Sequence, residues 1–385
     1  GELGDLQAVP ALIKALRDSY SDVRRVAAEA LGELGDLQAV PALIKALGDS
    51  DRDVRREAAE ALGKLGDLQA VPALIKALRD SDRDVRREAA EALVKIGAPA
   101  IPALIQALGD WNEHVRHAAC IVLGELGDPQ AVPALSVWVH AGANAAHHAL
   151  QALGHPALDL SQAVAQVAAQ GAWGVLIRAL PNEKVRKAVV RLGAPAVPAL
   201  IQALRDSDEG VRRAAVEALG ELGDLQAVPA LIKALGDSDR DVRREAAEAL
   251  GELGDLQAVP ALIKALRDSY SDVRRVAAEA LGELGDLQAV PALIKALGDS
   301  DRDVRREAAE ALGKIGDLQA VPALIQALRD SEWWVRCAAC EALGELGDLQ
   351  AVPALTERLQ DESEDVRKAA QDAIQQIKAK QSGKD

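Results

Sequence analysis

The 385-residue chain contains no phenylalanine and no methionine, and only 2% of its residues are aromatic. Its apolar residues are almost all alanine, leucine, valine and isoleucine, which favours short, closely stacked helices over a core filled by large rings. The three cysteines, Cys120, Cys337 and Cys340, form no even disulfide framework. This indicates a reducing compartment, and we expect a cytoplasmic protein.

The chain also has no apolar run of about 18 residues, which argues against a membrane-spanning helix. Its formal net charge of −15 opposes loose binding to nucleic acid or to an anionic membrane. We therefore expect neither of them as a partner. The oligomeric state is not indicated by the sequence.

What the chain does have is one repeated unit of 31 residues. Residues 4–34 are identical to residues 254–284, and residues 35–64 are identical to residues 285–314. A fixed period of this length is typical of architectures in which each unit stacks on its neighbours. The core of such a chain grows with every unit, so its length does not imply separate globular domains.

One unit reads as two antiparallel helices. In residues 35–65, Asp36 lies where a helix N-cap belongs and Pro41 falls in the first turn, where its missing N–H costs little. The Gly-Asp-Ser-Asp stretch at residues 48–51 ends the first helix and offers capping oxygens to a second. About twelve such units follow from the positions of their first glycines, which predicts an all-α fold.

The recurrent pattern GD-x-x-AVPAL-I-x-AL, followed by D-x-x-VR-x-AA-x-AL-G-x-[LI], resembles the short HEAT-like repeats of the phycobilisome-lyase type. It is similar also to artificial HEAT-repeat binders built from that consensus. The resemblance implies a right-handed α-solenoid of about twelve helical hairpins, with the second helices along the concave face. It further implies that the recurrent Asp53-Val54-Arg55 motif forms a stabilising polar ladder. It does not imply one function, because the family includes scaffolds, lyases, hydroxylases and binding modules.

The regularity of the repeat divides the chain. We expect regular repeats in residues 1–126, irregular repeats with an extra helical insert in residues 127–192, regular repeats with a polar C-terminal cap in residues 193–377, and a solvated tail in residues 378–385. The insert is the stretch 155–170. The irregular part carries a formal charge of +2, so the remainder carries −17.

Variation between the second helices points to a binding surface. His114, His117 and Ile121 are spaced three and four apart, which places them on one helix face above a constant scaffold. Neutral variation of an exposed face is the alternative. His147, which we align with His117 in the next second helix, and the two tryptophans Trp111 and Trp173 complete a predicted anchor for a protein partner at the irregular centre.

A second anchor is predicted at Trp333 and Trp334, where other repeats carry small or charged residues. Exposed tryptophan is enriched in interface hot spots, although a tryptophan packed over the neighbouring turn is the alternative. Cys337 and Cys340 are three apart, but without a second pair they are more typical of core residues than of a metal site. The acidic flanks favour a basic protein as the partner.

Enzyme chemistry finds little support. Imidazole is the commonest zinc ligand, and the candidate metal ligands are His114, His117, His147 and His148. No carboxylate or cysteine completes a recognised ligand spacing with them. We therefore expect no metal and no cofactor. Neither a Ser-His-Asp order nor a phosphate-binding glycine loop is present. We predict a non-catalytic protein–protein interaction scaffold that binds along the concave face. The alternatives are a chromophore-lyase-like or metal-assisted enzyme using the histidine-rich centre, and an engineered or consensus-like repeat chain without a natural ligand.

Overall fold

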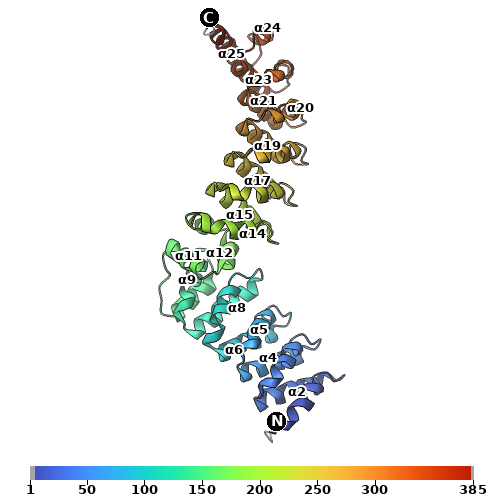
Figure 1. Cartoon of the computed structure of the whole chain (residues 1–385), viewed down its shortest axis with the longest axis vertical. Helices are drawn as coiled ribbons and strands as arrows, with labels where there is room; N and C mark the ends of the chain where they lie inside the picture. Colours follow the sequence, from blue (N-terminus) through green and yellow to red (C-terminus); the bar gives the residue numbers. More distant parts are fainter. Residues whose placement is uncertain (1–4, 383–385) are drawn as a thin grey trace. The chain divides into compact units, whose positions relative to one another are not determined.

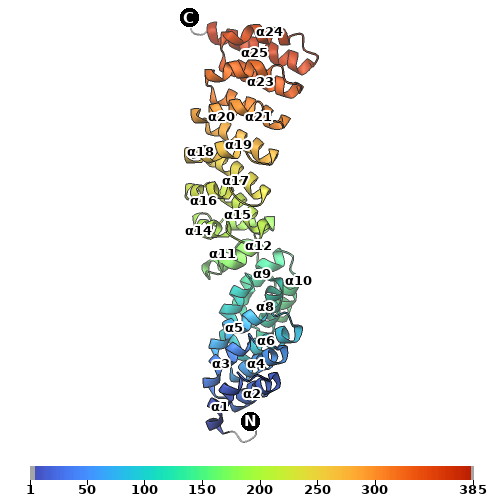
Figure 2. The same ribbon diagram turned by 90° about the vertical axis from the view of Figure 1, so that its right-hand side faces the viewer.

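The computed structural model describes residues 5–382, and all regular elements in that range are helical. The chain divides into two compact units, residues 1–192 and 193–385, and the hairpins of each unit follow one another in chain order (Figures 1 and 2). Each unit contains six hairpins, and the first unit has one additional helix. The all-α solenoid of twelve helical hairpins is thus confirmed. No helix in residues 5–382 is long and apolar enough to cross a membrane.

The helices of the first unit are α1 (Val9–Ala15), α2 (Ser21–Leu34), α3 (Val40–Ala46), α4 (Arg52–Leu65), α5 (Val71–Ala77), α6 (Arg83–Ile96), α7 (Ile101–Ala107), α8 (Glu113–Leu126), α9 (Val132–His140), α10 (Asn144–Ala152), α11 (Leu160–Ala169), α12 (Trp173–Ala179) and α13 (Glu183–Val190). The helices of the second unit are α14 (Val197–Ala203), α15 (Glu209–Leu222), α16 (Val228–Ala234), α17 (Arg240–Leu253), α18 (Val259–Ala265), α19 (Ser271–Leu284), α20 (Val290–Ala296), α21 (Arg302–Ile315), α22 (Val321–Ala327), α23 (Trp333–Leu346), α24 (Val352–Arg358) and α25 (Glu364–Ser382).

Capping residues fix the ends of each hairpin, as α3 and α4 illustrate. The Asp36 carboxylate accepts a hydrogen bond from the backbone of Gln38 in the short 3-10 turn before α3, and Pro41 occupies the first turn of that helix. Asp51 caps α4 in the same way. Gly66 then ends α4 with φ of 66°, a left-handed conformation that favours glycine.

Neighbouring second helices pack backbone against backbone in the regular part of each unit. A Cβ atom on Gly63 of α4 would lie 2.8 Å from the Cα of Ala92 of α6. The same pair recurs in the second unit, where a Cβ on Gly251 would lie 3.0 Å from the Cα of Ala280. Only glycine facing alanine permits this approach, which explains why these two residue types recur in every regular second helix.

An arginine–aspartate ladder connects successive hairpins. Arg55 donates from Nε and Nη2 to the two carboxylate oxygens of Asp80, at 2.7 and 2.8 Å, and from Nη1 to the carbonyl oxygen of Asp49 at 2.9 Å. The polar ladder implied by the family resemblance is therefore present through Arg55. Its aspartate is Asp80 of the next turn rather than Asp53 of the motif, which pairs with Arg56 at 3.1 Å. The same bidentate contact joins Arg24–Asp49, Arg212–Asp237, Arg243–Asp268, Arg274–Asp299, Arg305–Asp330 and Arg336–Asp361.

The irregular stretch of the first unit contains the expected extra helix. It is α11, which starts at Leu160, whereas residues 155–159 form a loop held against α9. In that loop the backbone N–H of Leu158 donates to Ser136 Oγ at 3.0 Å, and the Leu158 carbonyl lies 2.9 Å from His140 Nε2. The next first helix, α12, packs directly against α7, where Gly174 and Gly109 meet.

The C-terminal end is more ordered than expected. Residues 378–382, assigned to a solvated tail, continue α25 as far as Ser382, and Gln381 Nε2 donates to the carbonyl oxygen of Gly347 at 3.2 Å. Residues 383–385 of that tail lie outside the described residues. The last helix therefore also covers the end of the preceding hairpin.

Candidate functional site

The first unit departs from the regular packing at the junction between α6 and α8. Val94 stands in α6 where the other 14-residue second helices have glycine, and Val122 of α8 faces it in place of the usual alanine. Two valines cannot approach as glycine and alanine do. Accordingly, α6 and α8 pack less closely than α2 with α4, α4 with α6, or α8 with α10.

A shortened turn accompanies the two valines. The sequence Gly97-Ala98-Pro99 replaces the usual Gly-Asp-Leu-Gln, so this unit is one residue shorter than its neighbours. Gly97 has φ of 85° and ψ of −153°, whereas Gly66 has φ of 66° and ψ of 16° at the regular turn. The backbone therefore enters the α7–α8 hairpin in a different direction.

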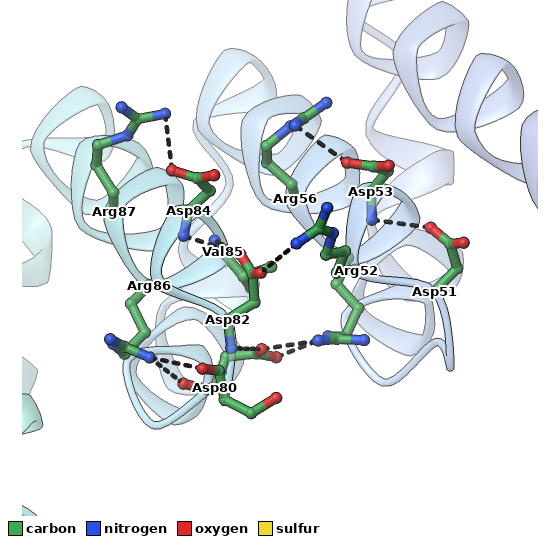
Figure 3. Close-up of polar contacts among 12 residues, drawn as sticks. Asp51, Arg52, Asp53, Arg56, Asp80, Asp82, Asp84, Val85, Arg86 and Arg87 are labelled. Carbon is green, nitrogen blue, oxygen red and sulfur yellow. Dashed lines mark hydrogen bonds and ion pairs between the residues drawn. The ribbon is translucent and has the colours of Figure 1, made fainter.

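The ladder breaks at the same junction. Arg86 of α6 still donates from Nη1 to the carbonyl oxygens of Asp80 and Ser81, at 2.6 and 3.1 Å. Its Nε and Nη2 atoms have no carboxylate partner within residues 5–382, because Asp110 forms an ion pair with Arg79 instead. Figure 3 shows Arg86 directed toward the turn that carries Asp80.

A groove of about 420 Å³ opens between the separated helices. Its apolar floor includes Ala90 and Val94 of α6 and Ala118, Ile121 and Val122 of α8. Charged and polar side chains surround this floor in an ordered way. Arg83, Arg86, Arg87, His114 and His117 lie toward the N-terminal ends of the two helices, and Glu91 and Glu125 lie toward their C-terminal ends.

A second hollow, of about 480 Å³, lies on the other side of α8. His114, His117 and Cys120 line it together with Trp138 of α9 and residues 143–145 at the start of α10. It exists because α10 begins about one helical turn later than a regular second helix. Trp138 is fixed there, since its Nε1 donates to the carbonyl oxygen of Leu108 at 3.0 Å and the Arg116 guanidinium lies 5.3 Å from its ring centroid.

The late start of α10 corrects one alignment made from the sequence. A Cβ on Gly124 of α8 would lie 3.0 Å from the Cα of Ala149, so Ala149 takes the place of the regular alanine. Counting back along α10, His147 corresponds to Cys120 rather than to His117. The alignment of His147 with His117 was therefore wrong by three residues, about one turn.

The structure brings together only part of the predicted central anchor. His114, His117 and Ile121 share the exposed face of α8 and line the groove, and Ile121 is 46% exposed. Trp111 is exposed in the turn before α8, where the Arg79 guanidinium lies 5.1 Å from its ring centroid. Trp173 is half-buried at the start of α12 and lines neither hollow.

The histidines do not converge on one point. His147 and His148 are exposed on α10, with ring centroids 6.2 Å apart, and His147 Nε2 lies 3.0 Å from Gln151 Nε2. Within residues 5–382 no three histidine, cysteine, aspartate or glutamate side chains are grouped so that they could hold a metal ion. His114, His117, His147 and His148 thus form no common ligand set.

The two tryptophans predicted as a second anchor have different environments. Trp333 is 41% exposed, whereas Trp334 is partly covered, with the Arg302 guanidinium 4.8 Å from its ring centroid. The two rings meet edge to face at 5.4 Å. The Trp334 Nε1 atom is buried and has no hydrogen-bond partner among the described residues. Trp333 is therefore the more accessible of the pair.

Two of the three cysteines are core residues. Cys120 and Cys340 are buried and Cys337 is half-buried. Burial raises the pKa of Cys120 and of Cys340 to about 12 and that of Cys337 to about 11. Thiolate chemistry at neutral pH is disfavoured by these shifts.

Sequence reasoning missed Val94, Val122 and Arg86, which create the groove. The sequence did contain a signal for the groove. Residues 90–96 read AEALVKI, whereas residues 59–65, the equivalent stretch of the preceding repeat, read AEALGKL. Hollows between first helices, by contrast, recur in both units. One of about 530 Å³ lies between α3 and α5 and one of about 300 Å³ between α14 and α16, so they follow from the repeat itself.

Solved structures with similar folds include an engineered protein and a protein of Escherichia coli. The engineered protein is 23% identical, covers 96% of this chain and 98% of its own, and has a TM-score of 0.39. The YibA protein of E. coli is 19% identical over 86% of this chain and 98% of its own, with a TM-score of 0.41. The CpcE–CpcF complex of phycocyanin lyase from Nostoc sp. PCC7120 is 26% identical over 58% of this chain and 96% of that chain, with a TM-score of 0.36.

No curated protein matches the sequence. A family model of HEAT repeats, however, matches residues 9–93, 71–154, 197–282, 259–332 and 290–375. These matches cover well over half of the chain in both units. They agree with the stacked hairpins, the capped turns and the arginine–aspartate ladder. The chain therefore belongs to the HEAT repeat family.

Proposed function

We propose that the chain is a non-catalytic scaffold that binds a partner protein on its second-helix face, centred on α8. The observation that carries the proposal is that α8 is bordered by two hollows, of about 420 and 480 Å³, both lined by His114 and His117. Regular second helices bury their facing residues against one another. At α8 the equivalent surface is open to an occupant.

The nature of this surface favours a protein over a small molecule. The apolar side chain of Ile121 is exposed beside charged side chains from α6, a mixture typical of protein interfaces with an apolar centre and a polar rim. The two hollows flank a single helix, so one occupant that uses both must extend across α8. A segment of another protein meets that requirement.

Substitution of Ile121 tests this function. We expect Ile121→Arg to abolish capture of partner proteins, because a charged side chain would stand on the apolar floor. Leu37→Arg is the matched control, since Leu37 is an exposed leucine of a regular 3-10 turn, 54% accessible. Capture from a lysate of the source, compared between the two variants by quantitative mass spectrometry, measures the effect. Equal capture by both variants with unchanged helicity would overturn the proposal.

Trp333 is the second proposed contact. Its exposure in the second unit is high for a tryptophan outside an interface, and truncation of such residues commonly weakens binding. The double variant Trp333→Ala, Trp334→Ala should weaken partner capture without loss of helicity. Capture equal to that of the unmodified chain would remove this contact and leave the α8 surface as the whole site.

A further inference from the structure

The Nε and Nη2 atoms of Arg86 indicate which chemical group a partner would bring to the groove. In every complete ladder step these two atoms hold the two oxygens of one aspartate, as in Arg55–Asp80 and Arg243–Asp268. At Arg86 the Nη1 contacts to the turn are kept, so the guanidinium is oriented as in the other steps. Asp110, which would complete the step, pairs with Arg79 instead, so these two donors lack a carboxylate among the described residues.

We propose that the partner supplies this carboxylate: an acidic side chain of a partner segment occupies the α6–α8 groove and pairs with Arg86 in place of the missing ladder aspartate. The inference rests on the proposed binding function of the α8 surface. An arginine fork and a carboxylate fit each other in a planar, bidentate contact, which gives direction as well as affinity. Arg86 is half-buried, so the contact would be shielded from water.

Charge along the groove sets the direction of the occupant. Arg83 and Arg86 lie at one end and Glu125 lies at the other. Between these ends, Arg87 pairs with Asp84 and Glu91 of its own helix at 3.6 and 3.8 Å. The positive ends of the α6 and α8 dipoles lie at the arginine end as well. A segment would therefore place its acidic residue there and its apolar residues over Ile121 and Val94, which lie about 8 and about 12 Å along the helix direction from Arg86.

This local preference is opposite to the one expected from the net charge. The chain as a whole is strongly acidic, which favours a basic partner, whereas the groove has three arginines against two glutamates. Short-range pairing in a partly buried groove is screened less than long-range attraction between exposed charges. We therefore assign the groove to an acidic and apolar segment.

The test uses the full chain and a phage-displayed library of random short peptides. We expect selected peptides to share one aspartate or glutamate next to apolar residues. Synthetic peptides amidated at the C-terminus, with the acidic residue kept or changed to its amide, are then titrated by fluorescence polarisation. Arg86→Gln should lower the affinity for the acidic peptide by about tenfold or more and leave the affinity for the amide peptide unchanged.

Arg83→Gln is the matched control, because Arg83 is an exposed arginine of the same groove that is not part of the ladder. Arg83→Gln should lower the affinity for the acidic peptide only slightly, and this small loss should be larger at low salt. A double-mutant cycle between Arg86 and the peptide carboxylate measures the pairing itself. Circular dichroism of each variant verifies that the helices are intact.

The outcomes separate the two proposals. If peptide binding is lost in Ile121→Arg but is unaffected by Arg86→Gln, the groove binds and the assignment of an acidic segment is wrong. If no selected peptide depends on Ile121, the proposed function fails with it. If the chain alone forms dimers that Arg86→Gln dissociates, the occupant is a second copy, which also overturns the assignment of a foreign segment.

Discussion

Helix α6 takes part in two junctions that are built differently. Toward α4 it presents Ala92 to Gly63 and accepts the ladder contact from Arg55 through Asp80. Toward α8 it presents Val94, and Arg86 lacks a carboxylate. One helix thus has a closed junction on one side and an open one on the other. At these two junctions of α6, three features (small facing residues, a full-length turn and a complete ladder step) are all present toward α4 and all absent toward α8.

In the proposed function, stability and binding use the same positions of the repeat. In a closed junction the arginine is paired with an aspartate of the chain and the apolar side chains are buried. Few donors and little apolar surface therefore remain for contacts with a partner. The open junction exposes an apolar floor and an arginine with unused donors. The proposed site therefore comes with a local loss of the contacts that hold neighbouring hairpins together, and the neighbouring junctions must compensate for that loss.

Removal of a ladder arginine should give the largest difference in local stability between the closed and the open junction. Arg243→Ala leaves Asp268 partly buried without its partner and should lower the local opening free energy of α17 and α19 by about 3–5 kcal/mol. Arg86→Ala removes only hydrogen bonds to two carbonyls and should cost about 1 kcal/mol at α6. Hydrogen exchange monitored by mass spectrometry measures both. Equal losses would mean that the ladder step is no stronger than its backbone contacts.

Closing or opening a junction by substitution should have the next largest effect. Gly251→Val places a branched side chain where even a Cβ would lie 3.0 Å from the Ala280 Cα, and should destabilise the α17–α19 junction by about 1–3 kcal/mol. Val94→Gly in the open junction should cost no more than the helix propensity of glycine, about 1 kcal/mol. The same exchange experiment compares them, and a larger loss for Val94→Gly would contradict the role assigned to Val94.

Much of this comparison was accessible from the sequence. The period and the capping aspartates predicted the hairpins and their number, because those features repeat and each has a local physical cause. The ladder was expected only from the family resemblance. The open junction was not predicted because the decisive change, glycine to valine at residue 94, exchanges one apolar residue for another and adds no polar or aromatic side chain. The register of His147 was missed because α10 lacks its first turn, and similar residues suggested a different alignment.

The smallest predicted effect on stability comes from the ionisation of a buried glutamate. Closed junctions carry glutamates such as Glu88 and Glu307 on the inner side of the second helix, whereas α8 has Ala118 at the equivalent position. Burial, together with the charges of Glu310 and Glu279, raises the pKa of Glu307 to about 7. Since the folded chain binds this proton more tightly than the unfolded chain, stability should fall as the pH rises from about 4.5 to about 7.

Glu307→Gln should remove that loss. At pH 8 the variant is expected to be more stable than the unmodified chain at α21 by about 1–2 kcal/mol, because no buried charge has to form, and at pH 4 the two should be equal. Glu248→Gln, which changes an exposed glutamate of α17, serves as the control and should leave the pH dependence of α21 unchanged. Hydrogen exchange of α21 at the two pH values, corrected for intrinsic rates, tests it. A variant that is less stable at pH 8 would show that the pair with Arg306, 3.8 Å away, outweighs the cost of burial and that closed junctions gain from their inner carboxylates.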